Sequence, residues 1–138
     1  MFSIGTLSRR TGVKIPTIRY YEDMGLLPEP ERTAGNQRRY SQAGLDRLGF
    51  IKHARDLGFT IEAIRALIEL HEHPDHSCAT ANAIANAQLS DVQAKIARLK
   101  RLETELQRIA THCDGSGTAG DCYVLTSLAD HSLCETAH

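Results

Sequence analysis

Three cysteines carry the most reactive chemistry in this sequence, and their spacing is unusual. Cys78 precedes a segment rich in helix-forming residues, from about Thr80 to Thr111, whereas Cys113 and Cys122 follow it. Thiolates are ligands for soft or borderline divalent metal ions. The loop between Cys113 and Cys122 contains three glycines, which permit the tight backbone turns needed to fold around an ion.

The helical segment keeps Cys78 apart from the other two cysteines of its own chain. A straight helix of about 30 residues is about 45 Å long, whereas sulfurs that share a metal ion must lie within a few ångströms of one another. If two such helices pair antiparallel, Cys78 of one chain comes close to Cys113 and Cys122 of the other. The spacing therefore predicts a metal site shared between the subunits of a homodimer.

Further ligands are available near these cysteines, and other chemistry is also open to them. Structural zinc takes four nitrogen or sulfur ligands, and His76 and Cys134 are the best candidates for an additional one. The C-x8-C spacing is a weak motif by itself. It leaves two alternatives open: a redox-active disulfide between Cys113 and Cys122, or a protein that only buffers metal. No arrangement of nucleophile and base stands out, so we expect neither an enzyme nor an organic cofactor.

Charge is distributed unevenly along the 138 residues. Residues 1–55 contain ten Lys or Arg and five Asp or Glu, whereas residues 56–138 contain six and twelve. This asymmetry indicates a polyanionic partner for the first part only, and double-stranded DNA is the expected one. No apolar run approaches ~20 residues and the N-terminus lacks the apolar stretch of a signal peptide. We therefore expect a cytoplasmic protein with no membrane partner.

The basic part has the pattern of a winged helix-turn-helix. Gly12 separates two short helical segments, Pro16 suits the first turn of the second, and residues 31–40 resemble a β-hairpin that turns at Gly35–Asn36. Adjacent tyrosines in the second helix do not share a face, so one of them is expected to be buried. Basic and polar side chains of this helix and hairpin are the predicted DNA contacts: Lys14, Thr17, Arg19, Tyr20, Tyr21, Arg32, Asn36, Arg38, Arg39 and Tyr40.

The long helical segment carries a heptad pattern. Its apolar seam consists of Ala85, Leu89, Val92, Ile96, Leu99 and Leu106. The intervening charges, Glu105 among them, fit a solvated flank. The sequence thus predicts a mainly α protein. It has a winged helix-turn-helix domain at 1–70, a linker at 71–79, a dimerisation helix at 80–111 that forms an antiparallel coiled coil, and a metal-binding loop and tail at 112–138.

These motifs resemble the MerR family of bacterial transcription regulators over essentially the whole chain. The resemblance rests on the run IRYYEDMGLL, a wing that ends in RRY, and a following helix that contains ARDLGF. The long helix and the cysteine-bearing loop are similar to the metal-sensing branch. The resemblance implies a homodimer on a palindromic operator. There, metal binding distorts the DNA so that RNA polymerase engages the promoter and metal-resistance or efflux genes are activated.

The resemblance also assigns residues. It implies that Arg19 and Tyr21 contact DNA from the recognition helix and that Arg38 and Tyr40 do so from the wing. Cys113 and Cys122 match the two loop ligands. Cys78 falls where divalent-ion sensors carry cysteine and copper(I) sensors carry serine, which favours Zn(II), Cd(II), Pb(II) or Hg(II) as the effector. Zinc sensors often carry further ligands in the loop, but here Asp114 and non-ligating residues occupy those places, which shifts the expectation toward three-thiolate sensors.

Overall fold

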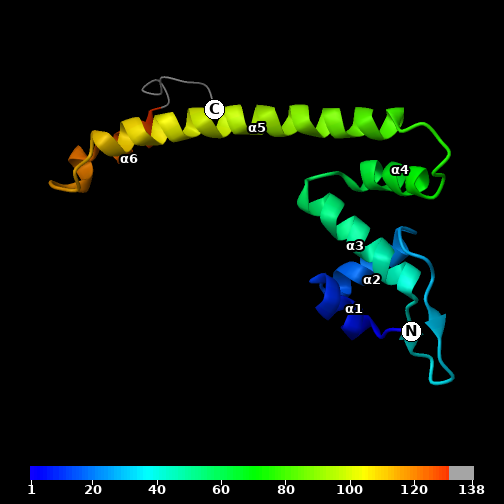
Figure 1. Cartoon of the computed structure of the whole chain (residues 1–138). Helices are drawn as coiled ribbons and strands as arrows, with labels where there is room; N and C mark the ends of the chain where they lie inside the picture. The colour runs from blue at the N-terminus through cyan, green and yellow to red at the C-terminus, as the bar shows by residue number, and fades with distance from the viewer. Residues whose placement is uncertain (131–138) are drawn as a thin grey trace. The chain divides into compact units, whose positions relative to one another are not determined.

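The structure, a computed structural model, describes residues 1–130, and Cys134 therefore lies outside the part described. Contacts divide the chain into one unit that ends at Ala85 and another that begins at Asn86. The elements follow in the order α1 (Ile4–Thr11), α2 (Ile15–Asp23), β1 (Glu31–Arg32), β2 (Arg38–Arg39), α3 (Gln42–Asp56), α4 (Ile61–His71), α5 (Ala79–Thr111), a 3-10 turn η1 (Ala119–Asp121) and α6 (Tyr123–Ala129) (Figure 1). The predicted mainly α fold is confirmed.

Local signals in the sequence account for the start and end of the first helices. The Ser3 side chain accepts a hydrogen bond from the Thr6 amide at 3.1 Å and caps α1. Gly12 ends this helix in the left-handed conformation, with φ of 76°, and its amide donates to the Ser8 carbonyl at 2.9 Å. Pro16 then lies in the first turn of α2, where its missing N–H is tolerated.

The wing is a short two-stranded hairpin. Strands β1 and β2 pair antiparallel, with Arg32 opposite Arg38. Asn36 has a φ of 62°, a conformation that asparagine tolerates better than most residues, and it closes the turn as predicted. Phe2 extends the pairing, because its backbone N–H and C=O bond those of Tyr40 at 2.7 and 2.8 Å. The N-terminus therefore fixes the position at which the wing enters α3.

One hydrophobic core holds α1–α4 and the base of the wing together. Leu7, Ile18, Leu48, Ile51 and Ile64, one or two from each helix, are completely buried. Burial of such side chains stabilises a fold by about 1.5–3 kcal/mol each. This core fixes the angle between α1 and α2 and hence the surface that the second helix presents.

Helix α5 has the opposite character. Four of its large apolar side chains are 46–64% exposed in the single chain: Leu89, Ile96, Leu99 and Leu106. They belong to the predicted heptad seam, so the helix lacks a covering for its apolar face within the described chain. Among residues 1–130, no helix is both long enough and apolar enough to cross a membrane.

Helix α3 begins with a side-chain cap at Ser41. The Ser41 hydroxyl accepts a hydrogen bond from the Gly44 amide at 3.1 Å. Replacing Ser41 with alanine will lower the free energy of unfolding by about 1 kcal/mol, because this amide loses its partner. Urea denaturation followed by circular dichroism measures the loss. Ser90→Ala, at an exposed position inside α5, is the control and will not destabilise, since alanine is the better helix former. Equal stability of Ser41→Ala and the parent would contradict the capping role.

Candidate metal and nucleic-acid sites

The structure brings Cys113 and Cys122 together. Cys113 follows the end of α5, Cys122 caps the start of α6, and their sulfurs lie 3.7 Å apart as free, partly buried thiols. Two sulfurs bound to one tetrahedral ion at about 2.3 Å each lie about 3.8 Å apart, whereas linear coordination requires about 4.6 Å. The spacing therefore fits two ligands of a tetrahedral or similarly bent site, and it is too long for a disulfide bond.

The surroundings of Cys122 favour its thiolate. The backbone N–H groups at Leu125 and Val124 and the thiol of Cys113 lower the pKa of Cys122, with the Leu125 amide making the largest contribution, while burial acts in the opposite direction. The thiolate is the form that binds metal. The start of α6 thus prepares this residue for coordination.

The loop between the two cysteines is shaped by Asp114. Its carboxylate accepts hydrogen bonds from the Ser116 amide at 2.8 Å and from the Ser116 hydroxyl at 2.6 Å. These bonds lower the pKa of Asp114. Gly115 and Gly117 adopt positive φ angles of 81° and 85°, which place the turns that return the chain to Cys122. The carboxylate at Asp114 thus has a structural use inside the loop.

A polar cluster links the end of α5 to α6, and the sequence did not indicate it. The Arg108 guanidinium donates to the Glu105 carboxylate and to the Tyr123 hydroxyl, and these partners raise the pKa of Arg108. The His112 ring stacks on Tyr123 with centroids 4.8 Å apart. Glu105 is only 4% exposed, so its prediction as part of a solvated flank is wrong. Tyr123 follows Cys122 directly, so this cluster holds the start of α6 against α5.

The other predicted metal ligands, Cys78 and His76, are exposed side chains that precede α5. Cys78 is exposed and immediately precedes α5. His76 is exposed and its ring stacks on His73 at 4.8 Å. Among residues 1–130 of a single chain, no group of three His, Cys, Asp or Glu side chains is arranged to hold a metal ion.

The predicted nucleic-acid face contains a basic groove. Lys14, Arg19 and Tyr20 of the α2 region are exposed, with Tyr20 50% accessible. A groove with a volume of about 370 Å³ runs between this helix and the wing, and its lining includes Arg19, Arg32, Asn36, Arg38 and Arg39. Arginines on a helix and an adjacent wing are suited to DNA phosphates.

Two of the predicted DNA contacts have rings that pack in the core. Tyr21 is 7% and Tyr40 2% exposed. The expectation that one of the two adjacent tyrosines is buried is confirmed, with Tyr21 inside and Tyr20 outside. The Tyr40 hydroxyl donates to Glu22, which also pairs with Arg38 at 3.2 Å. This connection was not predictable from residue spacing, because Tyr40 and Glu22 are 18 positions apart.

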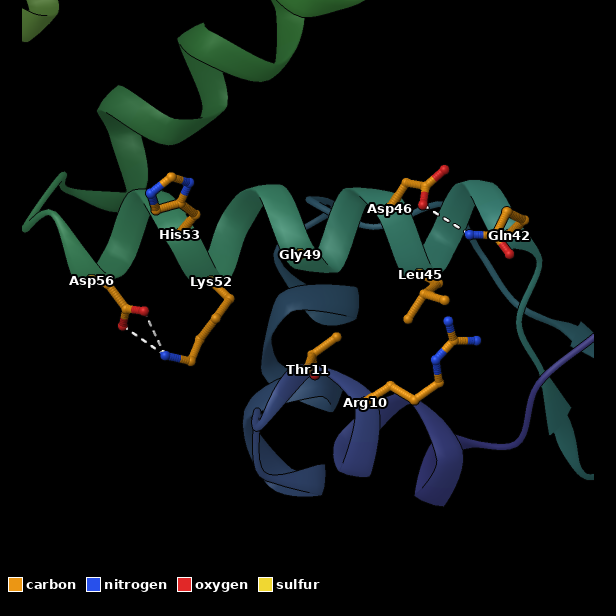
Figure 2. Close-up of a pocket in the computed structure, with 9 residues that line it drawn as sticks. All are labelled: Arg10, Thr11, Gln42, Leu45, Asp46, Gly49, Lys52, His53 and Asp56. Atoms are coloured by element: carbon orange, nitrogen blue, oxygen red, sulfur yellow. Dashed lines mark hydrogen bonds and ion pairs between the residues drawn. The ribbon is translucent and has the colours of Figure 1, made fainter.

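A second groove, between α1 and α3, has a volume of about 560 Å³ and a balanced charge (Figure 2). Lys52 is bonded to Asp56 at 2.7 Å, and the Gln42 amide donates to Asp46 at 2.9 Å. The Arg10 guanidinium lies over the Phe2 ring at 5.3 Å. Because its main cation is paired with an acid, this groove is a weaker candidate for phosphate than the basic groove beside the wing.

Comparison with known proteins points to one family. Residues 2–70 match the profile of the MerR HTH family regulatory protein, and residues 45–109 match the profile described as MerR, DNA binding. The chain is 39% identical to a mercuric resistance operon regulatory protein of Bacillus cereus, over 92% of this chain and 96% of the relative. It is 38% identical to the HTH-type transcriptional regulator ZntR of Escherichia coli K12, over 93% and 92%.

Solved structures agree. The transcription regulator PbrR691 from Ralstonia metallidurans CH34, in complex with lead(II), superposes with a TM-score of 0.77 at 38% identity and covers 93% of this chain and 99% of that one. The regulator MerR from Bacillus megaterium MB1, in complex with mercury(II), gives a TM-score of 0.68 at 32% identity, over 94% and 100%. Each similarity covers more than nine tenths of this chain.

Proposed function

This chain belongs to the MerR family of helix-turn-helix regulators, and on that premise we propose that it is a metal-responsive transcription regulator that binds promoter DNA as a homodimer. The single observation that carries the metal response is the 3.7 Å separation of the Cys113 and Cys122 sulfurs. That separation fits two thiolates on one bent site. Relatives in complex with lead(II) and mercury(II) support a divalent soft or borderline effector, Pb, Cd, Hg or Zn.

The third ligand is Cys78 of the partner subunit. Within one chain, the 33 residues of α5 separate Cys78 from Cys113, and they rise about 50 Å. Antiparallel pairing of two α5 helices removes this separation, because it sets the start of one helix beside the end of the other. A third thiolate also helps to neutralise a doubly charged ion, which favours divalent ions over copper(I).

The exposed seam of α5 provides the dimer interface. Its large apolar side chains, Leu89, Ile96, Leu99 and Leu106, recur at coiled-coil spacing and are accessible in the single chain. A second copy of the same helix is complementary to this stripe in both spacing and chemistry. The division into a DNA-binding domain at 1–70, a linker at 71–79, a dimerisation helix at 80–111 and a metal loop at 112–138 follows from this assignment.

Metal binding is coupled to DNA through the position of Cys78. This residue lies seven positions after the end of α4, and it is followed at once by α5. When Cys78 joins the loop of the partner, the start of each α5 becomes tied to the other chain, and the separation of the two winged units changes. The bound promoter is then distorted, and RNA polymerase initiates transcription from it. Both partners, DNA and polymerase, place the protein in the cytoplasm.

The function is tested by transcription from selected DNA. The reduced chain is used to recover duplexes from a genomic library, and a recovered promoter is transcribed with purified RNA polymerase. We expect Pb(II), Cd(II), Hg(II) or Zn(II) to raise transcript levels at least tenfold, and Mg(II) to have no effect, because hard ions avoid thiolates. Unchanged transcription with all four soft ions would refute the proposal. A response of metal-free protein to hydrogen peroxide alone would instead indicate a thiol redox regulator.

A further inference from the structure

An acidic side chain, Glu22, is paired with Arg38, one of the arginines that line the basic groove beside the wing. Glu22 is on α2, and its side chain is only 10% exposed. One carboxylate oxygen accepts a hydrogen bond from the Tyr40 hydroxyl, and the other lies 3.2 Å from Nε of Arg38. Both partners belong to the end of the wing, so a single carboxylate connects the recognition helix to the wing.

The Tyr40 end of this connection is rigid. The Tyr40 ring is 2% exposed, and its backbone is bonded in both directions to Phe2 at 2.7 and 2.8 Å. Burial of the ring, followed by the hydrogen bond to Glu22, raises the pKa of Tyr40, so the hydroxyl stays protonated as a donor. Glu22 is therefore anchored to a point that the core holds in place.

The Arg38 end faces the basic groove. Its Nε is paired with Glu22, and this pairing does not use the two terminal amino groups of the guanidinium. Arg38 also lines the groove together with Arg19 and Arg39. The contact is an ion pair in which the buried Nε makes no hydrogen bond within residues 1–130, and it restrains the guanidinium beside Glu22. A restrained guanidinium loses less conformational freedom when it bonds a phosphate.

We infer that Glu22 is a positioning residue for DNA recognition: it locks the wing to the recognition helix and orients Arg38 toward a backbone phosphate. This inference rests on the proposed function. It predicts a change in DNA affinity opposite to the one expected from the charge of Glu22 alone. An acid beside DNA repels phosphate, so loss of its charge would by itself strengthen binding. Positioning requires the reverse, a weaker complex once the carboxylate is neutralised.

The test compares Glu22→Gln with Glu31→Gln, an exposed acid of the same wing that serves as the charge-matched control. The probe is a duplex recovered by the wild-type chain, titrated at several salt concentrations. We expect Glu22→Gln to weaken binding about tenfold and to lower the salt slope by about one, the signature of a lost phosphate contact. Glu31→Gln should bind equally or more tightly. Tyr40→Phe, which keeps the ring, should reproduce part of the Glu22→Gln loss.

A measurement without DNA separates this inference from the proposed function. Hydrogen exchange of wing amides at 31–40 should be faster in Glu22→Gln than in the parent, while α3 and α4 keep their protection. If the wild-type chain recovers no duplex, the proposed function is overturned. The positioning role in DNA binding is then overturned as well, even if hydrogen exchange in the wing of Glu22→Gln is faster. Recovery of a duplex that Glu22→Gln binds as tightly as the parent, with an unchanged salt slope, would overturn the positioning role alone.

Discussion

Replacing Cys122 with serine will lower affinity for Pb(II) or Cd(II) by at least about 100-fold, since even outer-shell changes at metal sites cost about 10–100-fold. The hydroxyl is a hard and almost always protonated group, so it does not replace a thiolate that the start of α6 favours. Ligand-to-metal charge-transfer absorbance in a competition titration measures the loss. Binding of metal-free protein to DNA should stay within about twofold of the parent, because the winged unit is unchanged.

A mixture of two variants provides the control for this prediction. Cys78→Ser and Cys122→Ser chains each lack a ligand, but a mixed dimer with a shared site contains one complete set. We therefore expect randomly mixed chains to recover about a quarter of the wild-type metal capacity. Recovery of no capacity would contradict a site shared between subunits. Full capacity of Cys122→Ser alone would contradict the role of Cys122.

The double substitution Leu99→Glu and Leu106→Glu will convert the dimer into monomers and weaken DNA binding by at least about 100-fold. These side chains are 63% and 64% exposed in the single chain, so the isolated helix tolerates charge there, whereas the seam of a coiled coil does not. A dimer engages two half-sites at once, and this avidity contributes about 10²–10⁴-fold. Sedimentation measures the oligomer, and titration of the recovered duplex measures the affinity.

The matched control places the same charges beside the seam. Gln93→Glu and Gln107→Glu are exposed positions of α5 that follow the seam residues Val92 and Leu106. This variant should remain dimeric and bind DNA within about threefold of the parent, because flanking charges act only through screened repulsion. A dimeric Leu99→Glu, Leu106→Glu protein would show that another surface holds the subunits together.

Residues that act over one or two helical turns were predictable from the sequence. The Ser3, Ser41 and Thr60 side chains each accept an amide hydrogen bond at the start of a helix, and Gly12 takes the left-handed turn expected between the first two helices. The long helix begins within one residue of its predicted start and ends where predicted. These features depend on contacts between neighbours in the chain, so composition and spacing are sufficient to locate them.

The assignment of side chains to core or surface was less predictable. Tyr21 and Tyr40 have the chemistry of DNA contacts, but their rings are buried in the core. Glu105 looks like a solvated charge, but it is 4% exposed and pairs with Arg108, which also bonds Tyr123 of α6. Burial depends on which segments pack over a residue, and these segments are distant in the sequence.

By itself, the sequence determined the order of the elements, the apolar seam of α5 and the set of thiols on either side of it, because helical period and turn chemistry are local. Only the tertiary structure decided that the Cys113 and Cys122 sulfurs lie 3.7 Å apart. It also decided that Glu22 joins the recognition helix to the wing through Tyr40 and Arg38. The physical reason is that such pairs meet through the folding of a loop or the packing of a core. Both fix distances to within ångströms, and residue spacing leaves those distances undetermined.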